Sequence, residues 1–149
     1  MTPLALRPAR NADAEEAAQI LVASITELCH ADHRGEPELI AAWTANKTPD
    51  AVAAMIAAGG MLVAEAMDRI VGVGQADHRR GRVTLLYVAP EVRDAGVSTA
   101  LLAALEQALA SAGIETARLE TTETARAFYL ARGWRDTADA DVLAKRLTT

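Results

Sequence analysis

The chain has little cysteine, few aromatic residues and no excess of positive charge. A single cysteine among 149 residues excludes an internal disulfide and suits a reducing compartment. Aromatic residues make up 3% of the sequence and hydrophobic residues 51%, so the core must consist mainly of small aliphatic side chains. The formal net charge of −5 argues against a general nucleic-acid-binding surface and is compatible with a cationic or amine substrate.

Long apolar runs, a secretory signal and internal repeats are also missing. No apolar run approaches the roughly 20 residues of a membrane-spanning helix. The first residues, Met-Thr-Pro-Leu, lack the basic and apolar regions of a signal peptide. We therefore expect a cytoplasmic protein with no membrane partner. The length of 149 residues fits one domain with one core, covering residues 1–149.

One stretch changes its hydrophobic period in the middle and predicts a strand, a turn and a helix. Residues 83–88 are β-branched and apolar, which indicates a buried strand, and Pro90 ends it. From Val97 the apolar residues recur at helical spacing until Gly113, a residue that favours a helix end. The turn between strand and helix therefore contains Arg93-x-x-Gly96-x-Ser98.

A turn of this kind suits an anion, because the first N–H groups of a helix have no intrahelical partner and carry partial positive charge. Gly96 permits a tight turn or a close backbone approach, and Ser98 adds a small hydroxyl. The stretch is not a Walker loop, since no Gly-Lys-Ser/Thr follows, and it lacks the three glycines of a dinucleotide motif. An anion site and an ordinary strand–loop–helix turn both fit these residues.

The remaining patterns predict an α/β (α+β) fold, with a mixed sheet and helices on both faces. The expected strands are residues 4–7, 61–65, 70–74, 83–88, 116–120 and 142–147. The expected helices start after Asn11 or Asp13, at Pro37, at Pro49 behind a Thr48 cap, at Val97 and at Glu123. Residues 61–88 should form an antiparallel meander, the strand after the long helix should run parallel to 83–88, and residues 31–36 should be a polar loop.

Four segments share their order and spacing with a known family: Leu4-Ala5-Leu6-Arg7-Pro8-Ala9, Tyr87-Val88-Ala89-Pro90-Glu91-Val92-Arg93, Arg93-x-x-Gly96-x-Ser98 and Ala125-x-x-Phe128-Tyr129-x-x-x-Gly133-Trp134. They resemble the opening strand, the fourth strand and its exit, the pyrophosphate signature and the late motif of the GNAT superfamily of acetyl-CoA-dependent N-acetyltransferases. The resemblance covers nearly the whole chain. It implies a GNAT-like sheet, acetyl-CoA as co-substrate, no metal, and direct attack by a primary amine of a small molecule or peptide.

The same resemblance implies the site residues. Backbone groups of Tyr87 and Val88, on a strand that diverges from its neighbour, would pair with the pantetheine amides. Tyr129 would protonate the leaving thiolate, although a tyrosine that merely packs against the sheet is the competing interpretation. The residues implied to hold the CoA pyrophosphate are Arg93, Asp94, Ala95, Gly96, Val97, Ser98 and Thr99.

Three departures from the family pattern matter. Ser98 stands where glycine or alanine is usual, and serine is still small enough for a close approach. Thr122 stands where the late motif has asparagine; threonine can cap the helix but lacks the second amide group. Residues 83–88 carry no carboxylate, although many relatives keep a glutamate base there. The base therefore remains open among Glu120, Asp77, His30, His33 and water.

Other residue groups carry alternatives of their own. The cluster of Cys29, His30, Asp32 and His33 lacks a recognised zinc spacing, so a solvated loop is favoured over substrate contact, and substrate contact over metal. Either Arg126 or Arg132 would meet the CoA 3′-phosphate, unless both belong to a solvated helix face. Trp43 and Trp134 would line a pocket or pack in the core.

Two other classes of protein compete with the enzyme. A GNAT-like domain could hold acyl-CoA as a non-catalytic sensor or interaction module, which the missing strand glutamate and Thr122 would favour. A metal-binding or structural domain built on the Cys29–His33 cluster ranks last. A homodimer is compatible with the family, and no feature of the sequence identifies the amine acceptor.

Overall fold

In the computed structural model, which describes residues 4–92 and 96–147, the described strands form one seven-stranded sheet. The strands are β1 (Ala5–Pro8), β2 (Met61–Ala66), β3 (Arg69–Asp77), β4 (Arg82–Val88), β5 (Thr116–Glu120), β6 (Arg135–Asp136) and β7 (Val142–Arg146). The helices are α1 (Ala14–Leu28), α2 (His30–His33), α3 (Pro37–Thr44), α4 (Pro49–Ala58), α5 (Val97–Ser111) and α6 (Arg126–Leu130), with short 3₁₀ turns η1 (Asn11–Asp13) and η2 (Pro90–Val92).

The sheet is mixed, as the sequence predicts. Its strand order is β1-β2-β3-β4-β5-β7-β6, and β1 to β4 pair antiparallel with their neighbours. After the long α5 crossover, β5 returns parallel to β4, and β7 then pairs antiparallel with both β5 and β6. The expected meander and the expected parallel strand are therefore confirmed.

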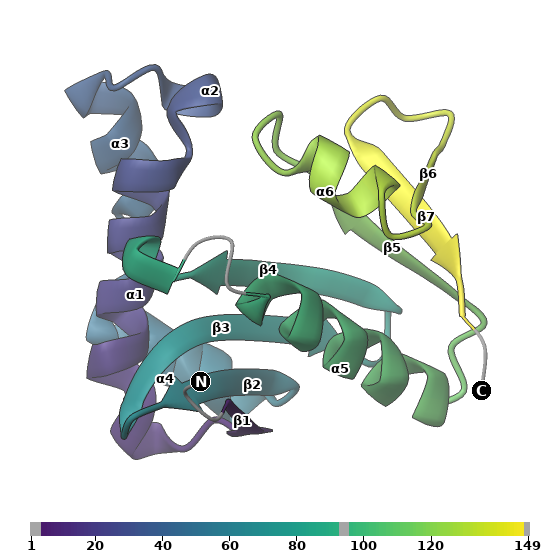
Figure 1. The fold of residues 1–149 in the computed structure, drawn as a ribbon, viewed down its shortest axis with the longest axis horizontal. Coiled ribbons are helices and arrows are strands. Elements are labelled where there is room, and N and C mark those ends of the chain that lie inside the picture. Colours follow the sequence, from purple (N-terminus) through teal and green to yellow (C-terminus); the bar gives the residue numbers. More distant parts are fainter. Residues whose placement is uncertain (1–3, 93–95, 148–149) are drawn as a thin grey trace.

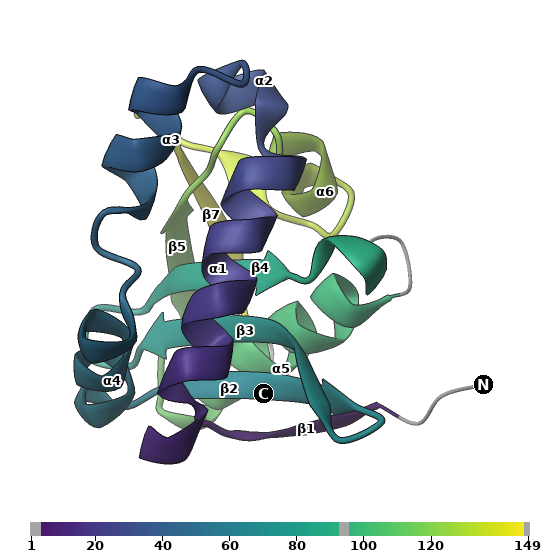
Figure 2. The same cartoon turned by 90° about the vertical axis from the view of Figure 1, so that its left-hand side faces the viewer.

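Helices cover both faces of the sheet. Helix α1 crosses one face with α4 beside it, and α5 lies on the other (Figures 1 and 2). Under α1, Ala17 and Leu21 are buried with Val52 of α4 and strand residues such as Val63 and Val73. On the other face, the leucines of α5 are buried with residues of β4, β5 and β7, namely Leu102, Leu105, Leu109, Val83, Ala117, Leu119 and Leu143.

Two glycines of β3 let α5 lie close to the sheet. A Cβ at Gly72 would come within 2.7 Å of Leu101 Cδ1, and one at Gly74 within 2.8 Å of Leu105 Cδ1. Both distances are shorter than ordinary carbon–carbon contact. The absence of a Cβ at these two glycines therefore sets how closely α5 approaches the sheet, and with it the place where α5 begins.

Three sequence predictions are wrong in detail. Residues 31–36 were expected to be a polar loop, yet α2 spans His30–His33, because the His33 ring is buried and ties this turn to α1. The helix expected from Glu123 to Arg132 is shorter, since residues 123–125 form a turn before α6. Strand β6 was not expected at all, and it comprises only Arg135 and Asp136.

The expected helix caps are partly confirmed. Thr48 Oγ1 accepts a hydrogen bond of 3.2 Å from the N–H of Ala51 and caps α4. Asp13 does not cap α1, because its carboxylate instead accepts from both terminal nitrogens of Arg7, at 2.8 and 2.9 Å, and from the N–H of Arg10. In the described part of the chain, no helix combines the length and apolar character needed to cross a membrane.

Candidate active site

The sheet opens into a cleft between β4 and β5. These two parallel strands are in register only at Arg82 and Arg118, where the N–H of Arg118 donates to the carbonyl of Gly81 at 2.9 Å. Beyond that point the strands diverge (Figure 1). A cavity of about 500 Å³ lies along the opening, lined by residues 83–88 of β4 and by Leu119 and Glu120 of β5. The backbone edge of β4 that faces β5 is thus left without a neighbouring strand beyond the base of the cleft.

The sequence-predicted residues converge on this cavity. Those that line it are Tyr87, Val88, Gly96, Val97, Ser98, Thr99 and Tyr129. Arg93, Asp94 and Ala95, also predicted to bind the cofactor, lie outside the described residues. The structure therefore places every described member of the predicted set in one place, although its residues are up to 42 positions apart in the sequence.

The turn before α5 has the geometry of a close backbone approach. Gly96 is the N-cap of α5 with φ 82°, in the left-handed region that favours glycine. A Cβ built on it would meet nothing within 4 Å among the described residues, so its backbone faces open space. The following residues start α5 with their N–H groups at the cavity, which gives this end of the cleft a partial positive charge.

Arg132 brings a full positive charge to the same end. Its Nε and Nη2 donate to Thr99 Oγ1 at 3.1 and 2.9 Å, and its Nη1 donates to the carbonyl of Phe128 at 2.9 Å. The guanidinium carbon also lies 3.8 Å from the centre of the Phe128 ring. Among the described residues no carboxylate pairs with Arg132, so its charge remains available to an anion in the cavity.

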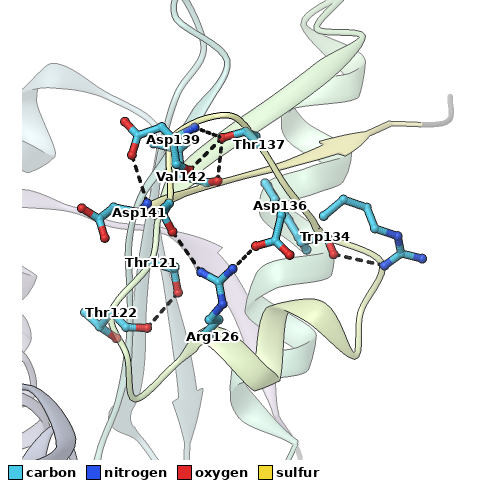
Figure 3. Close-up of polar contacts among 11 residues, drawn as sticks. Thr121, Thr122, Arg126, Trp134, Asp136, Thr137, Asp139, Asp141 and Val142 are labelled. Carbon is cyan, nitrogen blue, oxygen red and sulfur yellow. Dashed lines mark hydrogen bonds and ion pairs between the residues drawn. The ribbon is translucent and has the colours of Figure 1, made fainter.

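Arg126, the other candidate for a phosphate contact, faces away from the cavity. It forms an ion pair with Asp136 and donates to the carbonyl of Ala140 at 3.1 Å, as Figure 3 shows. It thereby fastens α6 to the loop that leads from β6 to β7. The structure thus separates the two arginines that the sequence left as alternatives: Arg132 lies at the cavity and Arg126 does not.

Tyr129 is buried at the cavity wall, with 7% of its surface exposed. Its ring packs edge-on against Trp134 and Phe128, with ring centres 6.0 and 5.3 Å away. Burial, with a smaller contribution from Tyr87, raises the pKa of Tyr129 well above its ordinary value. The hydroxyl therefore keeps its proton at neutral pH, as a general acid must.

The α1 side of the cavity holds a second tyrosine and the single cysteine. Burial, and then the nearby Cys29, raises the pKa of Tyr87 to about 12. Burial, followed by the charge of Asp32, raises the pKa of the Cys29 thiol to about 11. The thiol donates to the carbonyl of Ser24, with 3.8 Å between sulfur and oxygen. A thiol that stays protonated is a poor nucleophile, so Cys29 is not suited to carry an acyl group.

The candidate bases differ in whether they lie at the cavity. Glu120 lines the cavity, exposed, with an oxygen 4.0 Å from Arg82 Nη1. Asp77 is absent from the cavity lining; its carboxylate accepts from the N–H groups of Arg79 and Arg80, and these bonds lower its pKa. His33 is buried and absent from the cavity lining, and its ring lies against Ile25 of α1 and Trp43 of α3. The side chain of His30 is not among those described.

Among the side chains that the structure describes, which exclude that of His30, no three histidine, cysteine or acidic side chains are placed to hold a metal ion. Trp134 is a packing residue, fully buried, and donates to Glu106 at 3.2 Å, while Trp43 is half-buried, lies edge-on to His33 and stands beside Tyr87. Thr122 does not cap α6, whose N-cap is Ala125; its hydroxyl accepts from the N–H of Ala125 at 3.2 Å and so closes the turn before the helix.

Sequence reasoning named Cys29 only within a cluster for which a solvated loop was favoured over substrate contact, and it did not name Ser24, Leu28 or Thr124. Ser24, Leu28 and Cys29, from the last turn of α1 and its end, line the cavity, as does Thr124 before α6. The α1 residues follow the same helical apolar pattern as the core, so the sequence could not distinguish them from packing residues. They form the α1 wall of the cleft, and Leu28 also packs against the cluster that contains Val97 at the start of α5.

Comparison with known proteins identifies the family. The model of the acetyltransferase (GNAT) domain matches residues 16–148, and the chain belongs to this family. No curated protein matches the chain.

Solved structures share the fold. A GCN5-related N-acetyltransferase from Rhodopseudomonas palustris is 28% identical with a TM-score of 0.86, and the match covers 99% of this chain and 98% of that one. PaiA N-acetyltransferase from Thermoplasma acidophilum, solved with coenzyme A, is 19% identical with a TM-score of 0.82, covering 97% and 99% of the two chains. The N-acetylglutamate synthase of Neisseria gonorrhoeae, with coenzyme A and N-acetyl-glutamate, is 14% identical with a TM-score of 0.69, covering 100% of this chain and 36% of its own.

Proposed function

We propose that residues 1–149 form a single acyltransferase domain that moves an acetyl group from acetyl-CoA to a primary amine of a small molecule or peptide. The observation that carries this proposal is the convergence of Tyr87, Gly96 and Tyr129 on one cavity where β4 and β5 part, in a chain of the GNAT family. The coenzyme A present in two of the similar structures supports the choice of donor.

In this proposal the donor lies along the open edge of β4. The pantetheine amides pair with backbone groups at Tyr87 and Val88, in place of the strand that β5 would otherwise supply. The pyrophosphate sits at the turn around Gly96 and the first N–H groups of α5. Arg132, whose guanidinium has no acidic partner among the described residues, faces a phosphate of the same ligand.

The chemistry then needs one acid and one base. The amine attacks the thioester carbon, and the tetrahedral intermediate collapses with cleavage of the C–S bond. The Tyr129 hydroxyl, which is protonated at neutral pH, gives its proton to the departing sulfur as the C–S bond breaks, and the tyrosinate then regains a proton from water. The proton lost by the amine passes to Glu120, directly or through water, since Glu120 is the candidate base with a described side chain that lines the cavity.

The first test is calorimetric titration of CoA into the wild type and two matched glycine variants. Gly96 and Gly113 both have positive φ, at 82° and 91°, and neither would bring a Cβ within 4 Å of another described residue. They flank opposite ends of α5, so Gly96→Val and Gly113→Val introduce similar backbone strain. We expect Gly96→Val to weaken CoA binding at least tenfold and Gly113→Val to leave it unchanged. Absence of CoA binding by the folded wild type at millimolar concentration would contradict the proposal.

The second test separates an enzyme from a non-catalytic acyl-CoA-binding module, which the absence of a carboxylate in residues 83–88 favours. Amines, amino acids, polyamines and peptide N-termini are mixed with acetyl-CoA and the release of free thiol is followed. Acceptor-dependent thiol release supports the enzyme, while tight CoA binding without turnover supports the module. A cytoplasmic location, a possible homodimer and the lack of nucleic-acid or membrane partners stay predictions of the sequence.

A further inference from the structure

A carboxylate from α2 bridges the cleft at its α1 end. Asp32 accepts hydrogen bonds from the N–H of Glu123 at 2.8 Å, from the N–H of Thr124 at 3.3 Å and from the Thr124 hydroxyl. The partners are more than 90 positions apart in the sequence; Thr124 lines the cavity, and Asp32 lies three residues after Cys29, which lines it as well. Arg132 and Thr99, which also line the cavity, join the end of α6 to α5.

Asp32 is held firmly on its own wall. Its N–H donates to the carbonyl of Cys29 at 3.0 Å, and the neighbouring His33 is 1% exposed. The N–H of Gly35 donates to His33 Nδ1 at 2.9 Å, while Nε2 lies 2.7 Å from the carbonyl of Ile25. Nε2 must therefore carry the ring proton and donate it to Ile25. His33 thus ties α2 to α1 and fixes the position from which Asp32 reaches out.

On the Thr124 side, the bridge joins a short relay of hydrogen bonds that ends at Tyr129. Asp32 holds the turn at Glu123 and Thr124, and Thr122 Oγ1 accepts from the next N–H, that of Ala125, at 3.2 Å. The carbonyl of Ala125 in turn accepts from the N–H of Tyr129 at 3.2 Å. Displacement of this turn would therefore displace the first turn of α6 and the tyrosine it carries.

We propose that Asp32 is a positioning residue for acyl transfer: it holds the turn at residues 122–125 against α2 and so places the Tyr129 hydroxyl for proton donation. This inference rests on the proposed function. The bonds of Asp32 to Glu123 and Thr124 are exposed to water, whereas the contacts that fold α6 against Trp134 are buried. The bridge therefore opens without unfolding the domain, and it leaves a route for the amine into the cleft.

The test compares four variants by amide hydrogen exchange and by steady-state kinetics. Asp32→Ala removes all three bonds, Asp32→Asn keeps one acceptor oxygen, and Thr124→Val removes only the hydroxyl. Asp50→Ala is the control, because Asp50 is an exposed aspartate on α4 with no side-chain hydrogen bond or ion pair to a described residue. We expect faster exchange across residues 121–130 in Asp32→Ala, with CoA affinity and melting temperature unchanged.

In kinetics we expect kcat of Asp32→Ala to fall about ten- to a hundredfold, because a small misplacement of a reacting group is costly. Asp32→Asn should recover part of that loss, Thr124→Val should lose less than Asp32→Ala, and Asp50→Ala should match the wild type. A purely structural role would lower the melting temperature and the active fraction without this graded recovery.

The exchange measurement needs no turnover, so it separates this inference from the proposed function. If the wild type transfers no acetyl group but Asp32→Ala loosens residues 121–130, the proposed function fails while the bridge is supported. Unchanged exchange in Asp32→Ala overturns the inference, whatever the activity. Turnover of Asp32→Ala equal to that of the wild type overturns it as well.

Discussion

Strand β4 has two edges, and the chain treats them in opposite ways. Toward β3, six residue pairs are in register, from Gly72 with Val88 to Asp77 with Arg82. Toward β5, a single pair at Arg82 and Arg118 is in register, and a cavity follows. The paired edge holds the fold together, while the open edge leaves backbone groups for a ligand. Under the proposed function, one side of the β4 backbone therefore stabilises the sheet and the other binds the donor.

Substitutions on the two sides of β4 should separate these roles. The largest effect is expected at the open side. Tyr129→Phe keeps the buried ring and removes the proton-donating hydroxyl, so kcat should fall about a hundredfold or more. CoA affinity and unfolding free energy should stay nearly unchanged, because the hydroxyl acts only as the thiolate forms. Steady-state kinetics and calorimetry measure the two quantities.

A thioester with a better leaving thiol provides the control for Tyr129→Phe, since it needs less help from an acid and should lose less rate. Normal turnover by Tyr129→Phe would show that the tyrosine only packs and that water protonates the sulfur.

The next largest effect, a loss of stability, is expected on the side of β4 that pairs with β3. Gly72→Val introduces side-chain atoms where a Cβ alone would lie 2.7 Å from Leu101 and 2.9 Å from Val97. Overpacking of this kind costs about 1–3 kcal/mol of unfolding free energy. Urea unfolding should show this loss, while kcat per folded molecule stays close to the wild type. A Gly72→Val protein of normal stability would mean that α5 shifts easily on the sheet.

A smaller effect is expected for Arg132→Gln, which removes the charge at the start of α5. CoA affinity should fall about tenfold, the usual value of one charge-assisted contact to phosphate. Arg126→Gln is the matched control, because Arg126 is engaged with Asp136 away from the cavity. The difference should vanish for a pantetheine donor without phosphates; if it persists there, Arg132 acts through Thr99 and not through the ligand.

The smallest effect concerns alkaline stability. Burial raises the pKa of Tyr87 from 10.0 to about 12 in the folded protein. Between these values the unfolded chain releases this proton first, so the tyrosine lowers the unfolding free energy as the pH rises from 10 to about 12. Below pH 10 its contribution is complete. Unfolding of the wild type and Tyr87→Phe should therefore diverge above pH 10, and parallel curves would show that Tyr87 titrates normally.

Much of the fold followed from local patterns. The period change around Val97 predicts both β4 and α5, and the turn residues predict the meander, because each depends on residues close in sequence. Short polar elements could not be predicted from local patterns. Four residues are too few to show a helical period, so α2 depends on the buried His33 ring, a tertiary contact.

The residues of the site could be predicted from the sequence only where family motifs cover them. The motif around Gly96 and the one around Tyr129 locate two walls of the cavity, and the divergence of β4 and β5 came from the resemblance alone. The bridge from Asp32 to Thr124 joins residues 92 positions apart, and nothing in either local sequence encodes that pairing. The choice between Arg126 and Arg132 likewise required knowing which one Asp136 engages.

An unpaired strand edge is ordinarily an aggregation hazard, because another chain can add to it as a further strand. Here the unpaired edge of β4 is not at the rim of the sheet but in its interior, with β5, β7 and β6 on its far side. The end of α1 and helix α6 line the space beside it. A second protein molecule cannot lay a strand flat into a slot of this kind, whereas a slender, flexible ligand can. The interior place of this edge thus lowers the aggregation risk that unpaired backbone groups ordinarily carry at the rim of a sheet.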